Sequence, residues 1–274
     1  MSSRGSRVQG VQGVQGVQEF KSSIRQALSA FCREHGYPCF ELKTIMFDMD
    51  GVLFNSMPNH ARAWHRAMAF YGLDLPEDEA YMHEGRTGFG TINIVTQRQL
   101  GRSADKAECD KIYKKKSEIF NEYPTAERME GAFEVVKAVK ESGVTPTIVT
   151  GSGTASLLGR IEQNYPELFR HEWMVAARDV KFGKPNPEPY LMGMQKAGGL
   201  TPRQTMVVEN APLGVQAGVA AGCFVIAVNT GPLPDSVLLD QGAHLLFHSM
   251  RELSEHIADI IHEANTLSDV KCKM

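Results

Sequence analysis

The chain has few of the features that mark membrane or nucleic-acid-binding proteins. Among its 274 residues, no apolar run approaches the ~20 residues that a helix needs to span a bilayer, so an integral membrane protein is not expected. Charge of one sign is not in large excess either, because 29 Lys and Arg oppose 32 Asp and Glu. A formal net charge of -3 gives no electrostatic case for a nucleic-acid partner or an anionic membrane surface.

Cysteine is sparse and has no motif spacing. The five cysteines are odd in number and scattered, and none has the C-x-x-C spacing of a structural zinc site. We therefore expect free thiols in a reducing cytoplasm. The five are Cys32, Cys39, Cys109, Cys223 and Cys272.

The N-terminus is of low complexity, with Val-Gln-Gly three times in succession. For residues 1–18 this composition predicts disorder, or an artefact of the start site. From Glu19 to His35, apolar residues spaced by three and four predict an amphipathic helix, which Gly36 ends. Its apolar positions are Phe20, Ile24, Leu28 and Phe31.

From residue 42 onward, apolar runs alternate with helical patterns, which is typical of a parallel sheet covered by helices. We expect an α/β fold with a doubly wound parallel sheet, formed by residues 19–56 and 129–274. The expected strands are 44–47, 147–149, 173–176, 206–208, 224–228 and 244–247.

Residues 57–128 interrupt this alternation with helical periodicity throughout. They include a helix with apolar spacing, a Gly-rich break at 85–90 and a charged helix near 110–120. The segment is too long for a simple crossover connection, so we interpret it as an inserted helical cap domain over the edge of the sheet. The spacing of four, four and three falls on His60, Trp64, Met68 and Tyr71.

Two aspartates, one residue apart, follow the first expected strand. Strand side chains alternate with a period of two, so Asp48 and Asp50 share a face at its carboxyl end. Two crowded carboxylates repel each other unless a cation lies between them, which indicates a hard divalent ion such as Mg2+. The alternative is an ordinary Asp-x-Asp-Gly surface turn.

The next expected strand ends in a hydroxyl followed by a glycine turn. Thr150 and the backbone N–H groups of Gly151 and Ser152 can hold phosphate oxygens. The alternative is a routine turn in which Ser152 or Thr154 caps the following helix.

Two later segments add a lysine and a pair of oxygen ligands. Lys184 precedes a proline-rich, stiff loop, where it can neutralise a transferring group or simply be a solvated charge. Glu209 and Asn210 end another strand and suit Mg2+. Sites in open parallel sheets form outside the carboxyl ends of the strands, so these groups are expected to meet Asp48 and Asp50.

This ordered set of four motifs, over residues 42 to about 260, resembles the haloacid dehalogenase (HAD) superfamily. The resemblance implies a Rossmann-like core in which Asp48 is the nucleophile and Asp50 the general acid and base. It also implies that Thr150 binds the transferring phosphoryl group and that Lys184 stabilises charge. The implied Mg2+ ligands are Asp48, Asp50, Glu209 and Asn210, joined by Glu84 when the cap closes.

The insertion resembles the C1-type helical cap of the subgroup with β-phosphoglucomutase and many small-substrate phosphatases. Such caps exclude water and select the substrate. By this resemblance His60 times proton transfer by Asp50; the alternative is an ordinary helix residue. Arg86 can bind a leaving phosphate and Glu84 can reach the metal, or both are solvated loop charges. Thr87, in the same loop, is a further candidate for substrate binding.

The departures from the mutases favour hydrolysis. Asn210 stands where they have a carboxylate, and Gly88 where their cap loop has an arginine. With Glu84, this combination is similar to cap-bearing inorganic pyrophosphatases. We predict a monomeric, cytoplasmic, Mg2+-dependent phosphohydrolase acting on pyrophosphate or a small phosphomonoester. The alternatives are a β-phosphoglucomutase-type isomerase and a binding protein on a degenerate phosphatase fold; the presence of Asp48 and Lys184 disfavours the latter.

Overall fold

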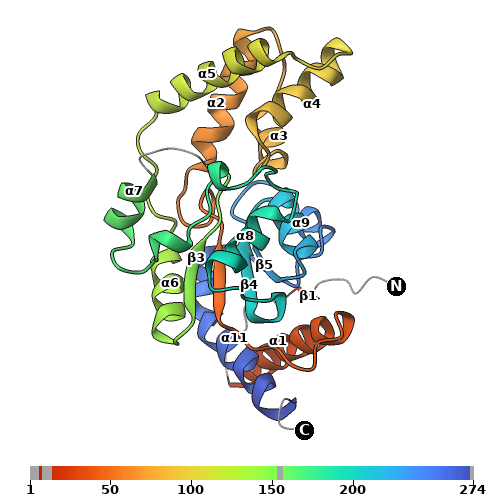
Figure 1. The fold of residues 1–274 in the computed structure, drawn as a ribbon, viewed down its shortest axis with the longest axis vertical. Coiled ribbons are helices and arrows are strands. Elements are labelled where there is room, and N and C mark those ends of the chain that lie inside the picture. The colour runs from red at the N-terminus through yellow and green to blue at the C-terminus, as the bar shows by residue number, and fades with distance from the viewer. Residues whose placement is uncertain (1–5, 8–13, 153–156, 272–274) are drawn as a thin grey trace.

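The computed structural model describes residues 6–7, 14–152 and 157–271. Within them, six parallel strands form one sheet in the order β1-β6-β5-β4-β2-β3. Figure 1 shows the sheet at the centre of the molecule with helices around it. The predicted α/β fold with a parallel sheet is confirmed. The strands are β1 Ser6–Arg7, β2 Thr44–Phe47, β3 Thr145–Ile148, β4 Thr205–Glu209, β5 Phe224–Val228 and β6 Leu245–Phe247.

Five of the six predicted strands are present within two residues of their expected bounds. The expected strand at 173–176 is wrong. Trp173 ends a short 3-10 helix, η1 (His171–Trp173), and a second, η2, spans Ala177–Asp179. Between them Val175 makes only an isolated bridge to Val149, because the chain is too short there to extend a ladder.

Helices cover both faces of the sheet. One face packs against α1 (Val14–Glu34), α6 (Ala132–Glu141), α7 (Leu157–Asn164) and α11 (Met250–Lys271) through the larger apolar core. The opposite face packs against α8 (Glu188–Lys196), α9 (Pro212–Ala220) and α10 (Asp235–Leu239). The sheet is therefore doubly wound, and the strands are buried on both sides.

Helix α1 confirms the predicted amphipathic helix but begins at Val14. Its predicted apolar residues, Phe20, Ile24, Leu28 and Phe31, are all buried, in a layer with α11. The disorder predicted for residues 1–18 is wrong for 6–7, which form β1, and for 14–18, which are helical. Here β6 offers a sheet edge for pairing and α11 a neighbouring helix. The rest of 1–18 lies outside the described residues.

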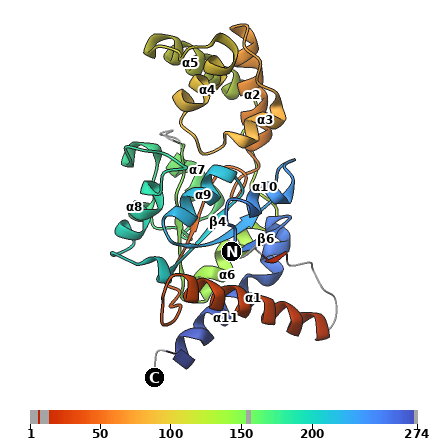
Figure 2. The same ribbon diagram turned by 90° about the vertical axis from the view of Figure 1, so that its right-hand side faces the viewer.

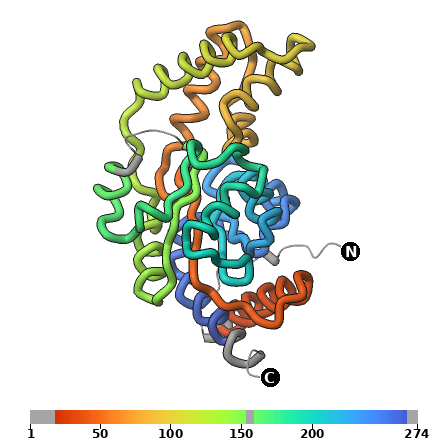
Figure 3. The backbone as a smooth tube through the Cα atoms, in the orientation of Figure 1, coloured from red at the N-terminus to blue at the C-terminus, as the bar shows by residue number. Residues whose placement is uncertain are grey.

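Four helices lie between β2 and α6 and stand above the carboxyl edge of the sheet (Figures 1 and 2). We call them the insertion; two linkers, residues 54–56 and 124–129, join it to the rest of the chain, as the backbone tube shows (Figure 3). The helices are α2 (Met57–Phe70), α3 (Glu77–Met82), α4 (Gly88–Leu100) and α5 (Lys106–Glu122). They share two small apolar clusters of their own.

The cysteines differ partly from expectation. Cys109 and Cys223 are buried and free. Cys39 is disulfide-bonded, so the prediction of free thiols is wrong for this residue. An odd number of cysteines means that they cannot all be paired, but it does not exclude one disulfide bond. Among the described residues, no helix has the length and apolar character needed to cross a membrane.

Candidate active site

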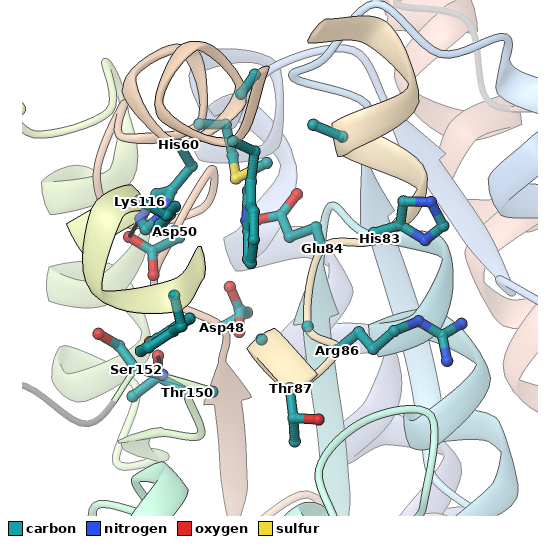
Figure 4. Close-up of a pocket in the computed structure, with 18 residues that line it drawn as sticks. Asp48, Asp50, His60, His83, Glu84, Arg86, Thr87, Lys116, Thr150 and Ser152 are labelled. Carbon is teal, nitrogen blue, oxygen red and sulfur yellow. Dashed lines mark hydrogen bonds and ion pairs between the residues drawn. The ribbon is translucent and has the colours of Figure 1, made fainter. Parts of the chain in front are cut away.

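The carboxyl ends of β2, β3 and β4 bring the predicted motifs together. The register pairs Phe47 with both Ile148 and Val208, so the residues that follow these strands meet at one edge. A cavity of about 130 Å³ lies between this edge and the insertion (Figure 4). Asp48, Asp50 and Thr150 line it from the sheet.

Lys184 is buried beneath the cavity-lining Asp48 and lines a smaller neighbouring cavity. Its ammonium group donates to Asp48 Oδ1, to Glu209 Oε1 (2.5 Å) and to the Val149 carbonyl oxygen (3.2 Å). The lysine is only 3% exposed, so its charge is held by these three acceptors. The structure thus brings Lys184 and Asp48 together as the sequence predicted.

Glu209 holds this lysine in place. Its Oε1 also accepts a hydrogen bond from the Tyr190 hydroxyl (2.7 Å), and its Oε2 accepts from the N–H groups of Asn210 (3.0 Å) and Ala211 (3.1 Å). The carboxylate is fully buried. Both oxygens are therefore engaged within the protein, and the predicted contact of Glu209 with a metal stays a prediction.

Electrostatics distinguishes the two members of the Asp48–Lys184 pair. Burial raises the pKa of Asp48 to about 7; Lys184 opposes this rise, and Glu209 and Asp50 add to it. Burial alone would lower the pKa of Lys184, but the carboxylates of Asp48 and Glu209 outweigh burial and raise it above the usual value. Lys184 stays protonated and compensates the charge of a deprotonated Asp48.

Asp50 has a separate set of partners from the insertion and its linker. Its Oδ1 accepts from the Ser56 hydroxyl (2.5 Å) and lies 3.6 Å from His60 Nε2. Lys116 Nζ donates to His60 Nδ1 at 2.8 Å, which leaves Nε2 to carry the imidazole proton towards Asp50. The predicted neighbourhood of His60 and Asp50 is therefore present in the structure.

These contacts and burial shift the pKa values of Asp50, His60 and Lys116. Burial would raise the pKa of Asp50, but His60, the Ser56 hydroxyl and Arg160 together lower it to about 2. Burial and the nearby Lys116 lower the pKa of His60. Burial likewise lowers the pKa of Lys116, to about 8.

Ser56 and Lys116 were not predicted from the sequence. Lys116 lies in the charged helix α5, where a solvated lysine is the ordinary expectation. A signal was present, since Lys116 follows Ile112 by four residues and precedes Ile119 by three, and all three are buried. Ser56 directly precedes α2 but makes no capping hydrogen bond to it.

Glu84 joins the insertion to the sheet. Its Oε2 accepts from Asn210 Nδ2 at 3.0 Å. Its Oε1 and Asn210 Oδ1 are buried without a hydrogen-bond partner. Burial raises the pKa of Glu84 well above its usual value, and Asp48 and Glu209 raise it further. A buried carboxylate with a free oxygen beside other carboxylates lacks a compensating cation.

This donor set fits the predicted Mg2+, which is a hard cation that takes oxygen ligands. The fit rests on the unpartnered oxygens of Glu84 and Asn210 and on the nearby carboxylates of Asp48 and Asp50. In the part of the chain that the structure describes, no three His, Cys, Asp or Glu side chains are spaced as a preformed metal cage.

The remaining predicted residues line the cavity with less direct contacts. Thr150 Oγ1 accepts from the Ser152 N–H at 3.0 Å, and Gly151 lies between them at the cavity wall. Thr87 Oγ1 accepts from the Gly90 N–H and so caps α4. Arg86 extends away from Asp48 in Figure 4, and its Nε is buried without a partner. The phosphate contact expected of its guanidinium stays a prediction.

Two aromatic residues of the insertion complete the wall, and the sequence did not predict their role. Trp64 and Tyr113 line the cavity opposite the sheet. A Cβ at Gly88 would lie 2.3 Å from the Tyr113 ring. Any side chain at position 88 therefore requires Tyr113 to move.

These features define a class of protein: an α/β enzyme with a carboxylate and lysine site of the phosphoryl-transfer type, covered by a helical insertion. A model of the haloacid dehalogenase-like hydrolases matches residues 42–222, and the chain belongs to this family of hydrolases.

Several relatives are similar to the chain. Hexitol phosphatase A of Escherichia coli is 33% identical, over 77% of this chain and 93% of its own. Glycerol-1-phosphate phosphohydrolase 1 of Saccharomyces cerevisiae is 29% identical, over 69% of this chain and 76% of its own. A solved structure from Bacteroides vulgatus, provisionally assigned as a beta-phosphoglucomutase, is 53% identical with a TM-score of 0.86, and covers 89% of this chain and 99% of its own. The family thus contains phosphatases and phosphoglucomutase-like proteins.

Proposed function

We propose that the protein is a Mg2+-dependent phosphohydrolase that acts through an aspartyl phosphate on Asp48. The observation that supports this most directly is the buried Asp48 carboxylate, paired with Lys184, at the floor of a cavity that Asp50 also lines. A charged lysine at this position offsets the repulsion between a carboxylate and an incoming phosphate. We propose further that residues 57–128 act as the cap domain, and that the protein works as a cytoplasmic monomer.

The reaction has two halves. In the first, an Asp48 oxygen attacks phosphorus, the bond from phosphorus to the leaving oxygen breaks, and Asp50 gives a proton to that oxygen. In the second, Asp50 takes a proton from water, the water oxygen attacks phosphorus, and phosphate leaves with Asp48 restored. The pKa of Asp50 is lowered to about 2, so Asp50 is ionised before substrate binds. It therefore takes the proton that it gives to the leaving oxygen from the bound phosphate, which enters as a monoanion.

Asp48, Asp50, Asn210 and Glu84 would hold the metal ion, and Thr150 would bind the phosphoryl oxygens. When bound, Mg2+ would neutralise charge on the transferring phosphoryl group. The 3.0 Å contact between Asn210 and Glu84 supports this arrangement, because it joins the insertion to the sheet beside Asp48.

The cavity wall supports hydrolysis of a small phosphomonoester. A mutase must bind a second phosphate on its sugar, and the position at which mutases have an arginine is Gly88, covered here by Tyr113. Arg86 points away from Asp48 (Figure 4). Trp64 and Tyr113 suit a carbon-bearing leaving group more than pyrophosphate. The hexitol and glycerol phosphatases among the relatives agree with this choice.

A phosphate-release assay tests the proposal and its alternatives. Hexitol phosphates, glycerol 1-phosphate, pyrophosphate and β-glucose 1-phosphate are each supplied with Mg2+ and with EDTA. We expect Mg2+-dependent release of phosphate from at least one polyol phosphate. Conversion of β-glucose 1-phosphate to glucose 6-phosphate with negligible phosphate release would instead show a mutase.

Replacing the nucleophile tests the mechanism. Asp48→Asn should abolish turnover, because an amide cannot form the aspartyl phosphate. The exposed Asp240→Asn is the matched control and should keep wild-type activity. Steady-state phosphate release and 32P labelling of the protein measure the effect; turnover retained by Asp48→Asn would rule out the phosphoaspartate route.

A further inference from the structure

Arg160, in α7, contacts both linkers of the insertion. Its guanidinium carbon lies 3.7 Å from the centre of the Phe54 ring, in the first linker. Its Nη2 donates to the Ala126 carbonyl oxygen at 3.0 Å, in the second linker. We propose that Arg160 is a positioning residue, which ties the two linkers to α7 and so sets how closely the insertion covers Asp48.

The two linkers form a short antiparallel pair. Phe54 and Arg128 form a bridge, the Asn55 N–H donates to the Glu127 carbonyl oxygen (3.0 Å), and the Met129 N–H donates to the Leu53 carbonyl oxygen (2.9 Å). A two-strand pair of this length is weak by itself, so a side chain that bridges it contributes to its geometry.

Tyr165, the residue after α7, also contacts the linker pair. The Tyr165 hydroxyl donates to the Leu53 carbonyl oxygen at 2.6 Å, and its ring packs edge-on against Phe54 at 5.7 Å between centroids. Arg160 and Tyr165 therefore both contact the Phe54 ring. The position of the linker pair depends on α7 as well as on its own hydrogen bonds.

The chemistry of arginine suits this place. A planar guanidinium can lay its face on a ring and donate in its plane to a carbonyl, whereas a lysine ammonium has no planar face to stack. Burial lowers the pKa of Arg160, and its Nε is buried without a partner. The nearby Asp50 opposes this fall, so the buried charge is offset by Asp50 as well as by the two linker contacts.

Linker geometry matters because the insertion meets the sheet through close contacts. Glu84 reaches Asn210 at 3.0 Å, and a Cβ at Gly183 would lie 3.3 Å from the Thr87 side chain. A shift of ~1 Å in such a site can cost about a hundredfold in rate. Loosened linkers would therefore weaken substrate binding and turnover while the sheet stays folded.

The test compares Arg160→Gln and Arg160→Lys with a control, Arg170→Gln. Arg170 also stacks on an aromatic ring (Trp173, 4.8 Å), but it is exposed, and within the described residues it makes no hydrogen bond to either linker. Amide hydrogen exchange is followed in peptides covering residues 52–58 and 124–130, with β4 as the internal reference. The kinetic constants kcat and KM are measured on the best substrate.

For Arg160→Gln we expect exchange about tenfold faster or more in both linker peptides and unchanged in β4, because local opening alone becomes easier. We expect KM to rise and kcat/KM to fall by about tenfold or more. Arg160→Lys should be intermediate, since it keeps the donor but loses the stack, and Arg170→Gln should match wild type. Linker exchange equal to wild type in Arg160→Gln, or equally faster in β4, overturns the proposal.

The kinetic arm rests on the proposed function, but the exchange arm needs no substrate. If the wild-type protein releases no phosphate from any substrate, the phosphatase proposal fails while the exchange result still decides the role of Arg160.

Discussion

Two buried lysines close to the aspartate pair have opposite pKa shifts: Lys184 beside Asp48, and Lys116 on the Asp50 side. Lys184 lies between the carboxylates of Asp48 and Glu209, which raise its pKa above the usual value in spite of burial. Lys116 instead contacts His60 and two aromatic rings, and burial lowers its pKa to about 8. The partners, and not the residue type, decide whether a buried ammonium group stays charged.

The lowered pKa of Lys116 predicts an alkaline limb in substrate binding. Below pH 8 Lys116 is protonated and attracts an anionic phosphate; above it the charge is lost and KM should rise. Lys116→Met should raise KM about tenfold at pH 7, as expected for loss of ~1.4 kcal/mol, and remove the limb. Lys115→Met is the control, because that lysine lies outside the cavity against Phe70. If KM still rises above pH 8 in Lys116→Met, the rise is due to the titration of another group.

The site residues that the sequence predicted are those attached to strand ends. Asp48, Asp50 and Thr150 follow apolar runs that are easy to recognise, and parallel strands place such residues at one edge. Lys116 and Tyr190 could not be assigned from the sequence, because their roles depend on contacts between segments far apart in the chain. Glu209 was recognised, but its buried hydrogen bonds to Tyr190 and the backbone were not.

At the scale of single elements, the turn after β2 requires a glycine. Gly51 has φ of 85°, and a Cβ there would lie 2.0 Å from Asn210 Nδ2. Gly51→Ala should lower the free energy of unfolding by about 1–3 kcal/mol and displace Asn210, so activity should fall strongly. Gly72 has a similar φ (72°), but a Cβ there would meet no atom within 4 Å. Gly72→Ala should therefore lower the free energy of unfolding and leave activity unchanged. Equal activity loss in both variants would contradict this reading; urea unfolding and phosphate release measure the two effects.

A substitution in helix α1 tests whether this helix contributes to the stability of the sheet and its covering helices. Leu28 of α1 is fully buried in the larger apolar core, whereas Gln26 in the same helix is exposed. Leu28→Ala should lower the free energy of unfolding by about 2–5 kcal/mol, because it leaves a cavity. Gln26→Ala should have little effect in the same denaturant titration. A small loss for Leu28→Ala would mean that α1 is not part of the cooperative core.

Strands were predictable where the run was apolar and paired on both sides. Residues 224–228 are all apolar and lie between two neighbours, so their prediction is correct at both ends. Residues 173–176 have the same apolar character but only one bridge, and local sequence does not show how many partners a segment will find. The strand Ser6–Arg7 is short and polar and forms only against β6, which the sequence could not indicate.

At the scale of the whole molecule, the sheet and the insertion have separate apolar cores. The sheet is covered by two large clusters, while the insertion has two small ones around Met68 and Ala63. The linkers and a few polar contacts, such as the one between Glu84 and Asn210, join the two parts. Separate cores permit the insertion to loosen without unfolding the sheet.

This separation makes a prediction about unfolding. Ile112 is buried in the insertion, and Ile226 in the sheet. Ile112→Ala should lower the stability of the insertion by about 2–5 kcal/mol and give a first, low-denaturant transition that Trp64 fluorescence reports. Ile226→Ala should move only the main transition, followed by circular dichroism. The main midpoint should stay unchanged in Ile112→Ala, and activity should be lost at the first transition, because the cavity needs both parts. A single transition displaced equally by both variants would show that sheet and insertion unfold as one unit.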